Sequence, residues 1–529
     1  MSCFSKILQN NEEYNKLSYA LSKNRVPMGA LGLSHINKVH LLHSLCEEKQ
    51  KCLAVTTDEA TARRMVDDLV TMGSRAYLYP ARDFSFSVSE GQSREYEHVR
   101  IGTLTKIIQN DFDVVVCSAE AFLQFTMPPE ELRDRTFRIV SGEDFSLDNA
   151  VSILIKAGYV RSPQVDGSGQ FALRGGILDL FPPDRENPVR IEFWGDTVDS
   201  ISSFETESQR RTDMLDEIEI TPATEIIFDS SEILKDKINE LLPLVKGKGS
   251  QKAKLSLLSD IDRLDSNVRV SSLDRYLPIA YASLSTIIDY CPENTLLCVC
   301  ESAGVKERAE ASIKLLNEEI KACFEEGTLC KGLDKFILSW SETLGVFGKS
   351  KTIYLDNLPR GSFDTPVKEL INFSALQLNL WNGTESVLLD DINYYKNKKD
   401  RTCVVMAGTD KAARALCDDL EKEGFNAIFF EKLPEEFPKG YISVIDGSLS
   451  AGMEYPQEKF RLISYGRRTA PKKVKKHKSY KASNAFHSLE EMHKGDYIVH
   501  SMHGIGIFEG ITQLGLRVSH NLATKQQQK

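Results

Sequence analysis

The sequence predicts an α/β protein built from several domains. Its 529 residues, 41% of them hydrophobic, are too many for one core and enough for about three to five. Two long regions alternate short apolar runs with amphipathic helical patterns, which is typical of parallel sheets covered by helices. Between them, strand patterns follow one another through turn residues, which is typical of an antiparallel meander. The predicted fold class is therefore multidomain α/β with an inserted β-rich domain.

The first α/β region covers residues 1–133. Cys52–Thr56 is expected to form a buried strand, and Asp58 to cap a helix that ends at Gly73. Four apolar residues at helical spacing are expected on the buried face of that helix: Met65, Val66, Leu69 and Val70. Two further strands and a helix between them are expected: Ala76–Tyr79, Asp113–Cys117 and Val99–Ile108. This alternation favours a parallel, doubly wound sheet.

Residues 134–222 show a different pattern, in which strand-like runs such as VRIEFW and TVDSISSF are separated by turns. In VRIEFW, alternation gives a core face and an opposite face: Val189, Ile191 and Phe193, then Arg190, Glu192 and Trp194. Trp and Arg are enriched at binding hot spots, so an exposed Arg190 and Trp194 predict a partner surface. The alternative is that Trp194 packs beneath a neighbouring loop.

Helical patterning returns at Ser231 and continues to about Asp289, before the apolar strand Thr295–Cys300. Residues 223–345 are therefore expected to complete the first α/β module. A second α/β domain is expected at 350–465, with a strand, a helix, its glycine cap and another strand: Cys403–Ala407, Thr409–Glu423, Gly424 and Ala427–Phe430.

The C-terminal part is basic, and its sequence pattern changes twice, from a linker to strands and then to a tail. Residues 466–485 are expected to form an exposed linker, because 466–483 contain eight Lys and Arg, no acid and almost no apolar residue. DNA contact is the alternative for this linker. Residues 486–515 include GDYIVHSMHGIGIFEGI, which has the alternation and glycines of two β-strands. Residues 516–529 are expected to be a disordered or non-native tail.

Composition limits the function classes. Residues 461–529 hold 13 Lys and Arg against 4 Asp and Glu, whereas residues 1–460 hold 53 against 72. An acidic body does not bind the DNA backbone broadly, so any nucleic-acid contact should be local. The 11 cysteines include no C-x-x-C pair, which favours buried thiols over a zinc ribbon or disulfides. No apolar run is long enough to span a membrane, so a cytoplasmic location and no membrane partner are expected.

Two of these stretches show a resemblance to known repair proteins. Ala172–Arg211 resembles the second domain shared by UvrB and the transcription-repair coupling factors, and Gly495–Ile511 is similar to the first strands of the coupling factors' RNA-polymerase-interaction domain. UvrB has no such domain, so the motif order points to the N-terminal part of a coupling factor. The resemblance implies a helicase-like (RecA-like) module in 1–133 and 223–345, and the truncated start of an SH3/Tudor-like barrel in 486–515.

A nucleotide site would require a P-loop, G-x-x-x-x-G-K-[ST], whose amides and Lys hold phosphates. The matching stretch starts at Gly29, and its second Gly, Lys and hydroxyl positions hold Ser34, His35 and Ile36. Gly29 and Gly32 can still form a tight turn from strand to helix.

The metal-binding acid is missing as well. UvrB places Asp-Glu-Ser-His after an apolar strand, and here Cys300 and Glu301 occupy the Asp and Glu positions. We therefore expect no catalytic residue, no metal, no cofactor and no ATP hydrolysis in this chain. ATP and Mg²⁺ would belong to motor domains that the family carries beyond the resembling part. The stretch from Tyr79 to Val114 is also too short for the DNA-clamping β-hairpin of UvrB, so damage verification is not expected.

The resemblance further implies a UvrA-binding surface. In the family, an Arg before Gly-Gly, a second Arg sixteen positions later and an aromatic four beyond form it, and Arg174, Arg190 and Trp194 occupy these positions. Trp stands where the family often has Phe. Whether Arg174 shares the face of the other two stays open, because Gly175-Gly176 can form a bulge that resets the alternation.

Four residues mark the expected start of the RNA-polymerase-interaction domain: Tyr497, Val499, Gly504 and Gly506. His500 and His503 nearby could suggest a metal pair, but a structural role is favoured because no third ligand is close in sequence.

The leading functional hypothesis is a fragment that acts as an adaptor. It would recruit UvrA to stalled RNA polymerase, with the polymerase contact weak or lost through truncation and DNA bound in the full-length protein. The alternatives are an ATP-dependent DNA translocase, a UvrB-like DNA-binding module and a single-strand-binding module built on the basic tail.

Overall fold

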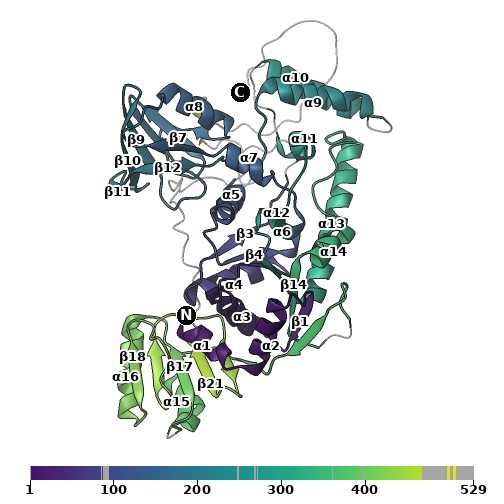
Figure 1. Ribbon diagram of the computed structural model, residues 1–529. Helices are drawn as coiled ribbons and strands as arrows, with labels where there is room; N and C mark the ends of the chain where they lie inside the picture. The colour runs from purple at the N-terminus through teal and green to yellow at the C-terminus, as the bar shows by residue number, and fades with distance from the viewer. Residues whose placement is uncertain are drawn as a thin grey trace. The chain divides into compact units, whose positions relative to one another are not determined.

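The computed structural model (Figure 1) divides the chain into two compact units, Met1–Arg468 and Thr469–Lys529. The structure describes the following residues: 2–84, 86, 94–246, 250–266, 270, 272–359, 362–396, 398–466, 497–500 and 504–507. Most of the first unit is therefore described, and two strands of the second.

The first sheet has seven strands in the order β15-β1-β14-β13-β2-β4-β3, and every neighbouring pair is parallel. Its strands are β1 (Met28–Leu31), β2 (Cys52–Thr56), β3 (Ala76–Tyr79), β4 (Val114–Ser118), β13 (Leu296–Cys300), β14 (Lys351–Asp356) and β15 (Glu369–Asn372). Four of them, β1, β2, β4 and β13, are buried at every position, as expected for a parallel sheet covered on both faces. The predicted parallel α/β sheet is confirmed.

Two of these strands lie in a different sheet from the one that sequence analysis assigned. β14 pairs with β1 and β13, and β15 pairs with β1, whereas both were expected in a second domain beginning at residue 350. Apolar patterning predicts that a strand exists, but its partner is fixed by tertiary pairing between distant segments. We use "first α/β module" for residues 2–134 together with 223–373.

The helices of the first α/β module are α1 (Cys3–Gln9), α2 (Glu12–Ser22), α3 (His35–Glu47), α4 (Glu59–Thr71), α5 (Glu95–Ile108), α6 (Ala119–Leu123), α7 (Pro129–Asp134), α9 (Ser231–Leu241), α10 (Ser250–Asp265), α11 (Leu277–Ala280), α12 (Ile287–Tyr290), α13 (Ser302–Glu326) and α14 (Trp340–Lys349). Asp58 caps α4 by accepting from the Thr61 amide at 2.8 Å, and Gly73 follows the helix with φ 100°, as predicted.

The expected apolar face of α4 is only partly right. Met65 and Leu69 are buried, but Val70 is exposed, because each residue turns the helix by about 100° and carries Val70 past the edge of that face. α5 begins at Glu95, four residues before the predicted start, since Glu95 and Glu97 suit the positive end of a helix dipole. Among the described residues between β3 and β4, α5 is present and no strand occurs.

The β-rich domain, residues 135–222, contains a six-stranded sheet in the order β11-β10-β9-β8-β7-β6. Its elements are β5 (Phe137–Val140), α8 (Leu147–Lys156), β6 (Val160–Arg161), β7 (Gln170–Arg174), β8 (Ile177–Leu180), β9 (Val189–Trp194), β10 (Thr197–Phe204), β11 (Arg211–Leu215) and β12 (Glu217–Ile220). β7 to β11 form the predicted antiparallel meander. The predicted core residues Val189, Ile191 and Phe193 pack with Ala150 and Leu154 of α8. The opposite side of the sheet is called the outer face below.

The second α/β domain, residues 376–466, has a mixed sheet in the order β16-β20-β21-β17-β19-β18. Its elements are β16 (Leu376–Leu378), α15 (Glu385–Ile392), β17 (Thr402–Met406), α16 (Asp410–Lys422), β18 (Ala427–Phe430), β19 (Ile442–Ile445), β20 (Gly452–Tyr455) and β21 (Phe460–Ser464). Gly424 has φ 80° after α16, so the predicted strand-helix-cap-strand sequence is confirmed. Residues of α3, β20 and β21 share one hydrophobic core, which joins this domain to the first α/β module.

In the second unit, β22 (Tyr497–His500) and β23 (Gly504–Ile507) pair antiparallel, with Tyr497 opposite Ile507 and Val499 opposite Ile505. The two predicted strands are confirmed, and the SH3/Tudor-like barrel remains a prediction. His503 lies outside the described residues, as do most of the basic linker and residues 508–529.

All 11 cysteines are free thiols, and eight of them are buried. The described part of the chain contains no helix with the length and apolar character needed to cross a bilayer. Within the same residues, no three His, Cys, Asp or Glu side chains are grouped so that they could hold a metal ion.

Candidate functional site

The turn from β1 into α3 is the stretch that matches a P-loop. Gly32 has φ 78°, and an added Cβ would lie 2.3 Å from the Phe373 carbonyl oxygen, so only glycine fits. Gly29 lies inside β1 rather than in the turn, and a Cβ there would meet the Leu370 side chain at 2.7 Å. Both glycines therefore permit close packing against the segment around β15.

The three positions that would hold phosphate and metal have structural contacts instead. The Ser34 hydroxyl donates to Asn37 Oδ1 at 2.5 Å, and Ile36 is fully buried in the core. His35 Nε2 lies 3.2 Å from Asp68 Oδ2, and Asp68 also accepts from the Ser450 amide and hydroxyl in the second α/β domain. The residue in the lysine position thus contributes to a contact between domains.

The carboxyl ends of β13 and β14 carry the remaining polar groups of this edge. Burial raises the pKa of the Cys300 thiol to about 12, so this group stays protonated and is a poor metal ligand at neutral pH. Glu301, with φ 61°, is ion-paired with the buried Lys38 of α3 and accepts from the Asn357 amide at 3.2 Å. Asp356 accepts from the Ser302 amide and hydroxyl, both at 2.6 Å. Glu301 therefore has an ion-pair partner, and Asp356 has hydrogen-bond donors, within the chain.

Sequence reasoning did not find Lys38 or Asp356. Lys38 lies three positions beyond the motif lysine, and its only sequence signal is a charge in an otherwise buried helix. Asp356 is the last residue of β14, in a segment that sequence analysis placed in another domain, so its proximity to β13 was not foreseeable.

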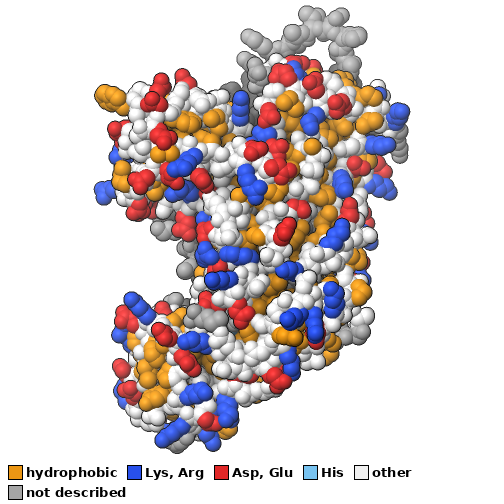
Figure 2. Space-filling model, in the orientation of Figure 1, with side chains coloured by type: hydrophobic (Ala, Val, Ile, Leu, Met, Phe, Trp, Pro, Cys, Tyr) orange, Lys and Arg blue, Asp and Glu red, His pale blue; other side chains and the backbone are white. Residues whose placement is uncertain are grey.

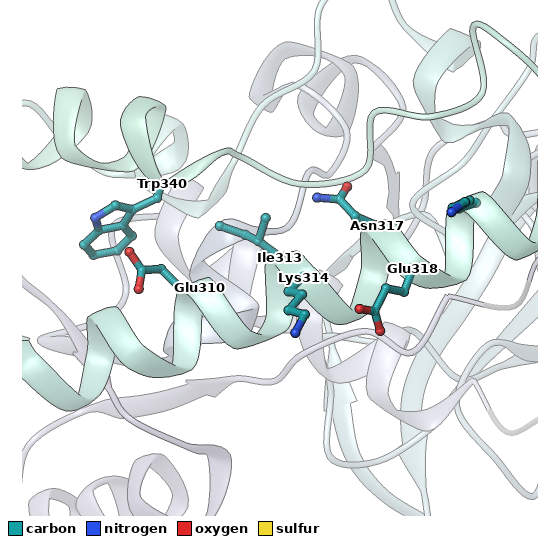
Figure 3. A pocket seen from close by; sticks show the side chains of 7 residues that line it. Glu310, Ile313, Lys314, Asn317, Glu318 and Trp340 are labelled. Carbon is teal, nitrogen blue, oxygen red and sulfur yellow. The ribbon is translucent and has the colours of Figure 1, made fainter.

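A pocket of about 480 Å³ lies elsewhere, along α13 (Figure 3). It is lined by Glu310, Ile313, Lys314, Asn317, Glu318, Lys321 and Trp340. Figure 3 shows the α13 side chains on successive turns, with Trp340 coming from the neighbouring helix. Its lining includes no residue of the β1–α3 turn, and acids and lysines alternate along it.

The predicted partner surface lies on the outer face of the β-rich domain. Trp194 ends β9 and is 85% exposed, so the alternative that it packs beneath a loop is wrong. Directly paired strand residues share a face, and Arg174 pairs with Ile177, which pairs with Glu192. Glu192 and Trp194 are two residues apart in β9 and therefore point to the same face. Arg174 thus lies on the same outer face as Trp194. Its guanidinium donates to the Pro163 carbonyl at 3.2 Å and remains exposed.

Arg190 differs from the prediction, because its side chain is only 15% exposed. It donates to both oxygens of Asp179 at 2.7 and 2.9 Å and to the Gln209 carbonyl at 3.3 Å, and it lies 4.7 Å from the centre of the Phe204 ring. These groups adjoin a small second core on the outer face: Val165, Ala172, Phe181 and Phe204. Alternation identifies the face of a side chain but not the loops and neighbours that cover part of it.

A further cation of this face was missed. Arg211 of β11 is ion-paired with Glu192, and its side chain remains 44% exposed. Arg211 lies in β11 and Glu192 in β9, and β10 lies between these two strands in the sheet. Alternation along a single strand does not predict such a contact, so the sequence carried no signal for it.

Charge is mixed on the side of the molecule that Figure 2 draws. On the face drawn in Figure 2, acidic and basic side chains are interspersed over the described residues. Interspersed charges of both signs favour local over extended nucleic-acid contacts.

Two protein-family models match the chain. Residues 137–226 match the UvrB interaction domain, which includes the whole outer face, and residues 492–528 match the CarD-like/TRCF RID domain. The second match includes most of 516–529, which sequence analysis had left outside that domain.

Curated relatives align along nearly the whole chain. The transcription-repair-coupling factor of Bacillus subtilis (strain 168) is 27% identical over 533 residues, which cover 98% of this chain and 45% of the relative. Those of Staphylococcus epidermidis (strain RP62A) and Staphylococcus aureus (strain Mu50) are 26% and 27% identical over 94% of this chain and 43% of each relative. The chain thus spans just under half the length of these relatives. The two matched domains, their order and these alignments make the chain similar to the N-terminal part of the transcription-repair-coupling factors.

Proposed function

We propose that the chain is an adaptor in transcription-coupled nucleotide excision repair, which recruits UvrA through the outer face of its β-rich domain. The observation that carries this proposal is Trp194, which is 85% exposed on the same sheet face as the exposed Arg174. The matched UvrB interaction domain and the name of the relatives support the same pathway. Such a role would place the protein in the cytoplasm.

The chemistry of this surface suits a protein partner. A large aromatic side chain buries roughly 150–250 Å² when it is covered, and Trp and Arg dominate binding hot spots. Trp194 ends its strand at the tight β9–β10 turn, and Arg174 ends β7 at the turn before β8, so both are held by a rigid sheet. Arg190 lies mostly beneath this surface and supports it through Asp179.

RNA polymerase is the second proposed partner. Its support is the match of residues 492–528 to the CarD-like/TRCF RID domain, in which β22 and β23 pair as expected. Two strands bury little apolar surface, so we expect this contact to be weak for the described part of the domain.

We further propose that this chain neither binds ATP tightly nor hydrolyses it. The motif positions are engaged by Asn37, Asp68 and the core, and Lys38 neutralises Glu301 where a metal site would need a free acid. The chain covers 45% of the Bacillus subtilis relative, and we assign DNA translocation to the part of the relatives that this chain does not cover.

The test is a calorimetric titration of UvrA into the purified chain and its Trp194→Ala variant. The variant should bind about 30-fold more weakly, a loss of about 2 kcal/mol, with an unchanged melting temperature. Tyr19→Ala is the matched control, because Tyr19 is also an exposed aromatic but lies on α2, outside the β-rich domain. Equal binding by the wild type and Trp194→Ala would refute the assignment.

A further inference from the structure

The outer face of the β-rich sheet has two parts with different degrees of exposure. At one end, Arg190 and Asp179 pair above Phe204 and are covered, since Asp179 is only 2% exposed. At the other end, Arg174 and Trp194 are exposed. Strand pairing connects Arg174 through Ile177 to Glu192, which lies two residues before Trp194 in β9. The guanidinium of Arg190 has three acceptor contacts inside the domain, so little of it is available to a partner.

Arg211 brings a second exposed guanidinium to the open end. It pairs with Phe204, an outer-face residue, and its side chain reaches across to Glu192. Glu192 is fixed from the other side by the Ser200 hydroxyl, which donates to Oε2 at 3.0 Å. Because Glu192 precedes Trp194 by two residues on the same face, this ion pair directs the Arg211 guanidinium toward the end of β9 that carries the indole.

The two arginines differ in what they contribute to folding. Exposed ion pairs such as Arg211–Glu192 add little to stability, whereas loss of Arg190 would leave Asp179 buried without a partner. Arg211 can therefore be changed without unfolding the sheet.

We propose that Arg174 and Arg211, rather than Arg190, are the two guanidinium groups that flank Trp194 at the contact with UvrA, and that Arg190 is a positioning residue. This inference rests on the proposed function. The complementary partner surface has an apolar recess for the indole with carboxylates on both sides of it, because cations at a contact rim select an oppositely charged surface. The residue before β11, Arg210, is fixed by two backbone contacts: its amide donates to the Ser208 hydroxyl, and its carbonyl accepts from the Glu205 amide. These contacts hold the start of β11, and with it Arg211, at the edge of the sheet.

The experiment is a calorimetric titration of UvrA into the full chain at low and at physiological salt. Arg211→Ala should weaken binding about tenfold at low salt and flatten its salt dependence, with an unchanged melting temperature. Arg211→Lys should restore most of the salt dependence, because it restores the charge. Arg138→Ala is the matched control: Arg138 is an exposed arginine paired with a glutamate, but it lies on β5, in the separate β5–β12 sheet. It should bind as the wild type does.

Arg190→Lys distinguishes positioning from contact. It should lower the melting temperature and leave the salt dependence of binding as in the wild type. If Arg190→Lys flattened that dependence, or if Arg211→Ala bound normally while Trp194→Ala did not, the inference would be wrong and the proposed function would stand. If Trp194→Ala also bound normally, the proposed function itself would fail.

Discussion

The β1–α3 edge of the first sheet and the outer face of the β-rich domain are both rich in polar residues, but they differ in where those residues find partners. At the edge, Lys38, Glu301 and Asp356 are satisfied by neighbouring groups of the same chain. On the outer face, Trp194 and Arg174 remain exposed. Polar groups that are balanced internally maintain a fold, whereas exposed aromatic and cationic groups are available to a partner.

The largest expected effect concerns Arg190. It belongs to the outer face, but like the polar groups of the β1–α3 edge it has its partners within the chain. Arg190→Ala should lower the free energy of unfolding by about 3–5 kcal/mol, because Asp179 would remain buried and unpaired. Urea unfolding of the chain measures it, with Arg138→Ala as the control that should change by less than about 1 kcal/mol. A loss as small as that of the control would mean that Arg190 is free to act at the surface.

A pH effect should come from α3, the helix that follows the β1–α3 turn. His40 contacts the Phe4 carbonyl and the Tyr455 hydroxyl, and burial lowers its pKa to about 4. The unfolded chain therefore binds this proton more readily, so the stabilisation is complete above about pH 6.5 and is lost as pH falls towards 4. We expect a loss of about 2 kcal/mol between pH 7 and 4.5. Urea unfolding across this range should show a weaker pH dependence for His40→Gln, and an unchanged dependence would contradict the assignment.

Changes to the exposed residues of the outer face should affect binding rather than folding. Trp194→Ala is expected to cost about 2 kcal/mol of UvrA affinity and less than about 0.5 kcal/mol of stability, because the exposed indole makes few contacts within the domain. Calorimetry and thermal melts on the same protein separate the two quantities. A fall in affinity that only followed the melting temperature would assign Trp194 to the core.

The smallest effect is expected at the degenerate nucleotide site. Lys38→Met should cost about 1 kcal/mol, since its partner Glu301 is partly exposed to water. MgATP should leave the melting temperature of the wild type and of the variant unchanged, because a ligand raises stability only if it binds the folded state. Stabilisation of the wild type that required Mg²⁺ would show a working site.

Sequence patterning predicted most elements of the fold because each depends on local information. The strand at 52–56, the Asp58 cap and the meander with its Val189, Ile191 and Phe193 core follow from periodicity and capping alone. The membership of β14 and β15 in the first sheet did not follow, because it depends on pairing with β1 across more than 300 residues of chain.

The candidate site was predictable to the same limit. Alternation identified the face of Trp194 and, once the strand register is known, that of Arg174. It could not show that Phe204 and Asp179 enclose Arg190, nor that Arg211 reaches Glu192 from another strand. Both are properties of packing between segments that the sequence does not place side by side.

Amide hydrogen exchange of the full chain tests the contrast between the two regions most directly, since one measurement follows both. UvrA should protect peptides that span β7 to β11, residues 170–215. MgATP should leave peptides of the β1–α3 turn, residues 28–40, and of the β13–α13 junction, residues 296–306, unchanged. Protection of either of these two segments by MgATP, or no protection of 170–215 by UvrA, would contradict the account.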